Sequence, residues 1–231
     1  MRAGDSRAPR LRIHPLKNVE FRLEGPTAPG PVGVANLSSS GIGLLRDSAK
    51  GFTWPAAGQK IKGSLLALGQ SVAVTIEIVH NRLPVVGGRF SDNLPAIAAF
   101  VSKCFQAELR ALRLAGVNPA VLKKPPKGTA HWYQDGSGNE LYFVDVDGAI
   151  DYFRIVFMGN VIEKFATGEL RAGKVEGEDR DGVEYKGSEL VKEIAGIPAD
   201  LRVAAVSFVE NVRNLEPEWK AKILPPLEAR K

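Results

Sequence analysis

The sequence predicts a β-rich protein of two domains: a small antiparallel β-barrel with a terminal helix, followed by an α+β domain of antiparallel sheet with C-terminal helices. Three observations predict this fold class. Short segments of alternating apolar residues, separated by glycine- and proline-rich turns, occupy most of residues 18–90. One amphipathic helical segment follows, as a small barrel requires when its open end must be closed. After a stretch rich in proline and lysine, strand patterns and then helical patterns recur.

The composition is that of an ordinary globular protein. The 231 residues, of which 44% are hydrophobic and 25% charged, suffice for two domains that each bury a core. The single cysteine, Cys104, excludes an internal disulfide, and the three histidines are not spaced as metal ligands, so we expect no metal and no cofactor. No apolar run is long enough to cross a membrane, and the N-terminus lacks a signal-peptide pattern. We therefore expect no membrane insertion and a cytoplasmic location.

The first domain is expected at residues 17–115, after a flexible basic arm at residues 1–16. The arm shows no periodicity, and its prolines argue against a helix. Strands are predicted over 18–23, 32–37, 42–45, 60–68 and 72–79, and a turn over 84–88 leads into Arg89-Phe90. Apolar residues spaced by three and four predict an amphipathic helix over 94–114, which ends the domain.

A linker is expected at residues 116–128, where proline and lysine concentrate, and a domain of unknown function at residues 129–231. Turn-forming residues predict two hairpins and a later strand, with turns over 135–138 and 159–160, the strand over 168–175 and a charged loop over 176–187. Helical patterns are predicted over 188–195, 198–215 and 216–224, and Pro225-Pro226 is expected to end the ordered structure. This half shows no family resemblance.

The segment Asn36-Leu37-Ser38-Ser39-Ser40-Gly41 places polar residues within an otherwise apolar region, Val32 to Leu45. Asn36 offers an amide that both donates and accepts hydrogen bonds, the serines offer hydroxyls, and Gly41 lets a ligand approach the backbone. Such a surface suits a flat, polar, anionic ligand. The alternative interpretation is a bulge or tight turn whose polar groups are satisfied by its own serines.

The pattern Asn-x-Ser-x-x-Gly, formed by Asn36, Ser38 and Gly41, resembles the second signature of the PilZ family, small β-barrel domains that bind the bacterial second messenger cyclic di-GMP. The resemblance covers approximately residues 5–115, from the basic arm to the helix. It implies that Asn36 and Ser38 hydrogen-bond a guanine or a phosphate and that Gly41 keeps the strand open. It also implies an Arg-x-x-x-Arg pair on the arm that clamps the guanines and phosphates.

The arm contains Arg7, Arg10 and Arg12, but none of its arginines are four residues apart. Arg12 precedes Asn36 by 24 positions, a distance that fits the family pattern. Arginine suits this ligand because its side chain stacks on guanine, forks to O6 and N7, and pairs with phosphate. Arg10 and Arg12 are the leading clamp candidates, with Arg7 behind them.

We therefore expect a non-enzymatic receptor: cyclic di-GMP binds the barrel, the arm folds over it, and the altered arm repositions the C-terminal domain or a protein partner. A second hypothesis is a PilZ-like adaptor that binds no nucleotide and recruits a protein of motility, pilus or biofilm control, which the missing four-residue spacing favours. A nucleic-acid-binding barrel is a third, weaker hypothesis, based on the basic arm and strand aromatics. A catalytic role is disfavoured because no nucleophile, base and orienting group occur at motif spacing.

Overall fold

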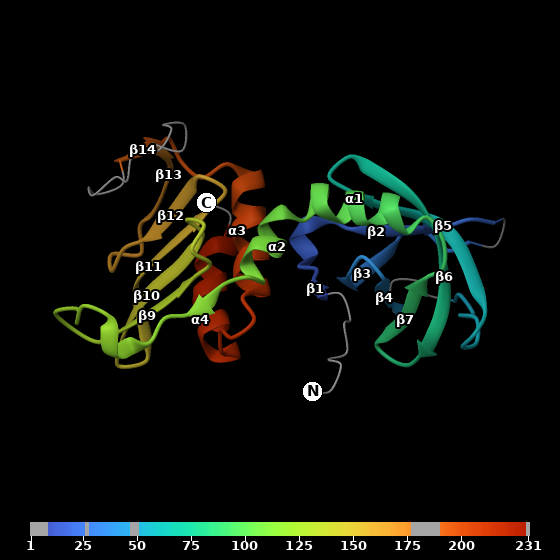
Figure 1. The fold of residues 1–231 in the computed structure, drawn as a ribbon, viewed down its shortest axis with the longest axis horizontal. Coiled ribbons are helices and arrows are strands. Elements are labelled where there is room, and N and C mark those ends of the chain that lie inside the picture. The colour runs from blue at the N-terminus through green and yellow to red at the C-terminus, as the bar shows by residue number, and fades with distance from the viewer. Residues whose placement is uncertain (1–8, 26–27, 47–50, 177–189, 230–231) are drawn as a thin grey trace. The chain divides into compact units, whose positions relative to one another are not determined.

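A computed structural model describes residues 9–25, 28–46, 51–176 and 190–229 (Figure 1). The clamp candidate Arg7 and the charged loop beyond Glu176 lie outside the described residues. The chain divides into two compact units, residues 1–109 and 110–231, so the division falls before the expected linker at 116–128. Each unit contains an antiparallel sheet and helices. The expected fold class, a β-rich protein of two domains, is confirmed.

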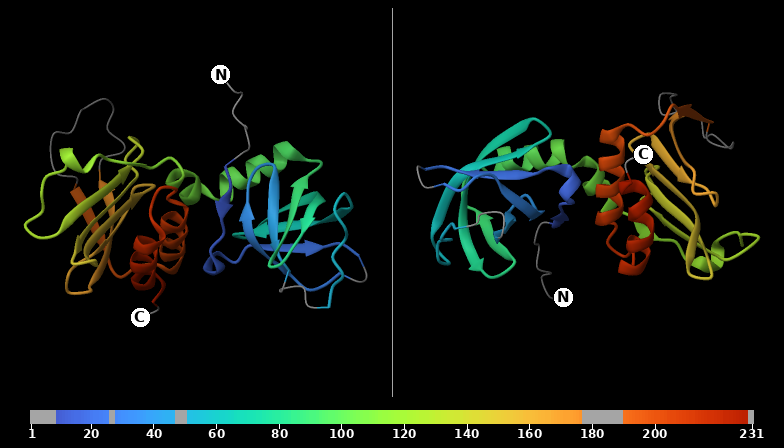
Figure 2. Two further views of the ribbon diagram at one scale, coloured as in Figure 1. Left: turned by 90° about the horizontal axis from the view of Figure 1, so that it is seen from below. Right: turned by 180° about the vertical axis from the view of Figure 1, so that it is seen from behind.

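The first unit is a closed antiparallel β-barrel (Figures 1 and 2). Its strands follow the order β3-β2-β5-β6-β7-β4, and pairing of β3 with β4 closes the barrel. The short strand β1 pairs with the C-terminal end of β3, and β2 pairs with the N-terminal end of β3. The elements are β1 (Leu11–Arg12), the 3-10 helix η1 (Pro15–Lys17), β2 (Glu20–Leu23), β3 (Val32–Leu37), β4 (Gly41–Leu45), β5 (Lys60–Ala67), β6 (Gln70–Asn81) and β7 (Val85–Phe90).

Alternate side chains of these strands point inward and form the barrel core. The largest fully buried ones include Phe21, Leu37, Leu44, Leu65 and Ile76. Burial of each such side chain stabilises the fold by about 1.5–3 kcal/mol. The barrel is followed by helices α1 (Leu94–Cys104) and α2 (Gln106–Ala111), and α1 packs on β6 with Ile97, Phe100 and Val101 buried.

One ion pair is buried with this core. The side chain of Lys17 is 5% exposed and that of Glu108 is 0% exposed, and Lys17 Nζ lies 2.5 Å from Glu108 Oε1. The same ammonium group lies 4.5 Å from the centre of the Phe105 ring. The second carboxylate oxygen of Glu108, Oε2, has no hydrogen-bond partner within the described part of the chain. The pair therefore joins η1 to α2 in a site from which water is excluded.

The structure corrects the expected arm. Leu11 and Arg12 form a strand, because Leu11 is an apolar residue that reaches the core and pairs with Leu37, and both leucines are fully buried. Pro15, which was expected to argue against a helix, begins the 3-10 helix η1, because a proline fits the first turn of a helix.

Two further expectations for this unit are wrong in detail. Residues 85–88 belong to strand β7 and not to a turn, because Gly87 and Gly88 allow β7 to pair closely with β6. The single helix over 94–114 is interrupted at Phe105, whose φ of −126° is not helical and whose ring is fully buried. Contacts in the core therefore override the local helical pattern at this position.

The second unit is a seven-stranded antiparallel sheet with two helices on one face (Figure 1). Phe143 packs on Trp219 and Phe157 packs on Phe208, with ring centres 5.4 and 5.2 Å apart. The sheet order is β14-β13-β12-β11-β10-β9-β8. The elements are β8 (Ala115–Gly116), η3 (Pro119–Val121), β9 (Thr129–Gln134), β10 (Glu140–Val146), β11 (Ala149–Phe157), β12 (Asn160–Lys164), β13 (Leu170–Glu176), β14 (Leu190–Ile194), α3 (Ala199–Asn211) and α4 (Pro217–Glu228).

Several boundaries in this unit differ from the sequence expectation. Residues 190–194, expected to be helical, form strand β14, because the edge of β13 offers backbone partners over residues 172–176. Helix α4 continues through Pro225 and Pro226, since Ile223 and Leu227, one turn apart, are both fully buried. The second hairpin turns at residues 158–159, one position earlier than expected. Part of the expected linker is sheet, because β8 pairs with β9.

Candidate functional site

Strand β1 brings the basic arm beside the polar motif. Arg12 lies directly opposite Asn36 on β3, next to the inward pair Leu11 and Leu37. Because successive side chains of a strand point to opposite faces, Arg12 and Asn36 share the outer face of the barrel. Arg10, two residues before Arg12, is also exposed. Of the three clamp candidates, Arg12 therefore lies next to Asn36, whereas Arg10 lies two residues before it, outside strand β1.

The cross-strand partners of Asn36 continue this arrangement across the barrel wall. Asn36 pairs with Gly43 on β4, Gly43 pairs with Gly87 on β7, and Gly87 pairs with His80 on β6. We call these residues, together with Arg12, the outer row. With neighbouring strands about 4.8 Å apart, the outer row extends over roughly 19 Å.

The two glycines of the outer row decide how its polar side chains lie. A Cβ atom added at Gly43 would fall 2.5 Å from Nδ2 of Asn36, and one added at Gly87 would fall 2.2 Å from Nε2 of His80. The amide of Asn36 and the imidazole of His80 therefore lie flat over glycines of the neighbouring strands. Two planar polar groups thus sit on adjoining parts of one outer surface.

His80 is not among the candidates that the sequence indicates, because no motif surrounds it and its spacing to the other histidines is not that of metal ligands. The signal that could have found it is the Gly-Gly pair at 87–88, whose first glycine, Gly87, lies opposite His80 once β6 and β7 are paired as a hairpin. That pairing requires the register, and the register has an irregularity between Ile78 and His80. The sequence pattern of β6 alone does not reveal it.

The side chain of Ser38 forms hydrogen bonds within its own turn. Its hydroxyl oxygen accepts hydrogen bonds from the backbone N–H of Gly41 at 3.0 Å and of Ser40 at 3.3 Å. The backbone N–H of Ser38 donates to the carbonyl of Gly41 at 2.8 Å. Ser38 is buried, so its hydroxyl fixes the connection between β3 and β4. This geometry agrees with the alternative interpretation, a tight turn satisfied by its own serines.

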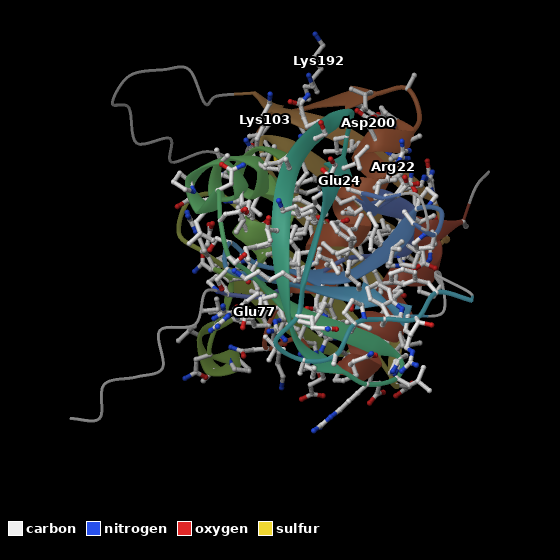
Figure 3. The ribbon with its side chains drawn as sticks, turned by 90° about the vertical axis from the view of Figure 1, so that its right-hand side faces the viewer. Arg22, Glu24, Glu77, Lys103, Lys192 and Asp200 are labelled. Carbon is white, nitrogen blue, oxygen red and sulfur yellow. The ribbon has the colours of Figure 1, made fainter. Side chains whose placement is uncertain are left out.

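Gly41 allows two strands to approach closely. A Cβ atom at this position would lie 2.7 Å from the carbonyl oxygen of Gly88 on β7, so a side chain here would push β4 and β7 apart. Its cross-strand partner is Arg89, whose Nη2 donates to Oε1 of Glu77 at 2.9 Å. Glu77 projects from β6 on the outer surface of the barrel (Figure 3). The neighbouring row of cross-strand partners, Gly41, Arg89 and Glu77, therefore contains an ion pair.

Other site chemistries find no support in the described residues. No group of three or more histidine, cysteine, aspartate or glutamate residues that could hold a metal ion occurs in the described ranges. Burial raises the pKa of the Cys104 thiol, which disfavours its reactive thiolate form. Among the helices of the described part, none is long and apolar enough to span a membrane.

Comparisons with known proteins identify no family. No protein-family model matches the sequence, and no curated protein matches it. Among solved structures, the chain is similar to that of an uncharacterized Legionella protein, Lpg0364, with 12% identity and a TM-score of 0.32. This similarity covers 41% of the chain and 91% of the Legionella protein.

Proposed function

We propose that the barrel is a PilZ-like, non-enzymatic receptor that binds cyclic di-GMP on the outer row. The observation that carries the proposal is the cross-strand pair of Arg12 and Asn36, in which one residue comes from the basic arm and the other from the Asn-x-Ser-x-x-Gly motif. Arg12 and Asn36 are 24 positions apart in the sequence, yet they are direct neighbours on one face.

The chemistry of the outer row suits this ligand. Cyclic di-GMP presents two purine faces, two guanine edges and two phosphates. Arg10 and Arg12 supply guanidinium groups that stack on guanine or fork to its O6 and N7 or to phosphate. The flat amide of Asn36 and the flat imidazole of His80 supply hydrogen bonds and a stacking surface. Ser38 and Gly41 then act indirectly, by fixing the turn and the strand spacing beneath the ligand.

The signal would come from the arm. Arg12 is held in β1, whereas Arg10 lies two residues before it and outside the strand, so a ligand that engages both would tie this part of the arm to the barrel. Attachment of the arm to the ligand changes the surface offered to the second unit or to a protein partner. The ligand shifts the equilibrium only by its differential affinity for the two arm states.

Isothermal titration calorimetry with cyclic di-GMP tests the proposal. We expect binding at concentrations on the order of tens of micromolar or below. In the variant Arg10→Ala/Arg12→Ala, loss of charged hydrogen bonds worth about 1.5–3 kcal/mol each should weaken binding at least tenfold. Arg22→Ala is the control, because Arg22 is an exposed arginine on β2, a strand that contributes no residue to the outer row. Absence of binding by the unmodified chain refutes the proposal.

A second candidate function is a PilZ-like adaptor that recruits a protein of motility, pilus or biofilm control without nucleotide. Two observations favour it: the arm has no arginines four residues apart, and the hydroxyl of Ser38 is engaged within its own turn. Under this function, Arg10→Ala/Arg12→Ala leaves partner binding unchanged. A pull-down with the purified variant and the unmodified chain, each with and without cyclic di-GMP, separates the two functions.

A further inference from the structure

The second unit has a face that its helices leave uncovered. Phe143 and Phe153 are fully buried, with Phe143 packed on Trp219 of α4, so their neighbours along the strands point to the opposite face. That face carries three aromatic side chains from three adjoining strands: Trp132 on β9, Tyr142 on β10 and Tyr152 on β11.

These aromatic side chains form one continuous floor. Trp132 lies directly opposite Tyr142, and the rings of Tyr142 and Tyr152 have their centres 6.1 Å apart at an angle of 60°. The floor is fixed by hydrogen bonds: Trp132 Nε1 donates to Glu140 at 2.9 Å, and the Tyr152 hydroxyl donates to Glu163 at 2.6 Å. The rings are therefore held in place before any ligand arrives.

The segment between η3 and β9 turns this floor into a groove. Two adjoining hollows of about 520 and 410 Å³ lie between the segment and the sheet, and both are lined by Lys123, Tyr142 and Tyr152. Trp132 lines the smaller hollow, and Lys127 lines the larger one. Each hollow has the size of an ordinary small-ligand site, and together they form an elongated groove in a single unit.

The charge of the groove is asymmetric between floor and wall. On the floor, Arg154 lies 3.4 Å from Glu140 and 3.8 Å from Glu163, so two carboxylates share one guanidinium group. The wall contributes the exposed lysines Lys123, Lys124 and Lys127. No ion pair joins these lysines to a carboxylate within the described ranges of the chain. Three lysines and one carboxylate, that of Asp151, therefore line the larger hollow over an aromatic floor.

We propose that this groove binds single-stranded nucleic acid, with successive bases against Trp132 and Tyr142 and the phosphates against the three wall lysines. Every base has a face that stacks on an aromatic ring, and a basic wall follows the backbone, which is the common design of sites that hold single strands without sequence preference. Two hollows in succession fit consecutive nucleotides. This function is separate from cyclic di-GMP binding and uses none of the residues of the outer row.

Fluorescence anisotropy of a labelled oligothymidylate of about eight nucleotides, titrated with the full chain at several salt concentrations, tests the proposal. Each phosphate contact on a single strand contributes about −0.7 to the slope of log K against log salt, so three lysines contribute roughly −2. The triple variant Lys123→Gln/Lys124→Gln/Lys127→Gln should lose this part of the slope and bind at least tenfold more weakly at low salt.

A matched control removes the same charge elsewhere. Lys62, Lys174 and Lys192 are exposed lysines outside the groove, and Lys192 is visible on β14 in Figure 3. Replacing these three by glutamine should leave binding within about twofold at a salt concentration near 0.15 M, where distant charges are screened. If this control loses as much affinity as the groove variant, binding follows net charge and the proposal is refuted.

Tryptophan fluorescence gives a second readout. Stacking of a base on Trp132 should quench the emission of the unmodified chain on oligonucleotide addition, and Trp132→Phe should abolish this quenching while Trp54 and Trp219 still emit. Competition identifies the occupant: displacement by unlabelled oligonucleotide supports the proposal, and stronger displacement by a mononucleotide or by polyglutamate refutes it. Oligonucleotide binding must also survive in Arg10→Ala/Arg12→Ala, since its loss would assign binding to the arm.

Discussion

Breaking the buried ion pair of Lys17 and Glu108 should destabilise the barrel strongly. Both side chains are at least 95% buried, and Lys17 Nζ lies 2.5 Å from Glu108 Oε1. Removal of one partner leaves an uncompensated charge in a medium of low dielectric constant, which costs about 3–5 kcal/mol of unfolding free energy. We therefore expect this loss for Lys17→Met, where the Glu108 carboxylate remains, and for Glu108→Leu, where the ammonium group remains over the Phe105 ring.

The double variant Lys17→Met/Glu108→Leu should be more stable than either single variant. Both charges are then gone, and two apolar side chains of similar volume fill the site, which in comparable pairs is neutral or stabilising by about 1–4 kcal/mol. The oxygen Oε2 of Glu108 supports the same expectation, because its desolvation is not offset by a hydrogen bond among the described residues. The measurement that decides is therefore whether the free energy of unfolding of the double variant is higher or lower than that of each single variant.

Cys104 provides an assay that reports on the barrel alone. It is the single cysteine of the chain, it lies in α1 of the first unit, and it is buried. The rate and extent of its labelling by a thiol reagent in increasing urea therefore measure unfolding of this unit, independently of the second unit. Single variants with midpoints close to that of the unmodified chain, or a double variant less stable than both, would refute the reasoning about the buried pair.

Three further predictions follow from the backbone and the titrating groups. Leu68→Asn should raise the free energy of unfolding by about 0.5–1 kcal/mol in urea, because Leu68 has a φ of 49° that asparagine adopts more readily, whereas Leu68→Val should lower it. Gly41→Ala should destabilise the barrel by about 1–3 kcal/mol in the Cys104 assay, because its methyl group meets the Gly88 carbonyl oxygen 2.7 Å away. Burial and the bond to Glu163 raise the pKa of Tyr152, so folded Tyr152 keeps its proton above pH about 10 while the unfolded chain releases it. The free energy of unfolding should therefore fall as the pH rises above about 10. In an absorbance titration at alkaline pH, Tyr152→Phe should remove the tyrosine that ionises last. An unchanged titration curve would contradict this prediction.

The candidate site shows what a local pattern can establish. The sequence located the polar segment from Asn36 to Gly41 between two strands, and the structure has that connection between β3 and β4. It could not tell whether the hydroxyl of Ser38 faces a ligand or closes its own turn, because both uses require the same residue types. The hydrogen bonds of Ser38 to Ser40 and Gly41 decide for the turn.

Prolines and glycines misled the sequence analysis where non-local contacts compete with local preference. Pro225 lies inside α4 because the buried pair Ile223 and Leu227 holds the helix in place. Gly87 lies inside β7 because the absence of a side chain makes room for His80 of the neighbouring strand. In both cases the local cost of a few kcal/mol or less is smaller than the gain from packing and pairing across the fold.

The sequence by itself determined the fold class, because the periods of two and of 3.6 residues directly report which residues face a core. It also determined that a basic arm precedes a polar connection in the first unit. Only the tertiary structure decided that Arg12 is the neighbour of Asn36 and that His80 lies in the same row across the barrel wall. It also decided that Trp132, Tyr142 and Tyr152 share one face under a lysine-bearing segment. These neighbours depend on strand register, and register is fixed by contacts between residues far apart in the chain.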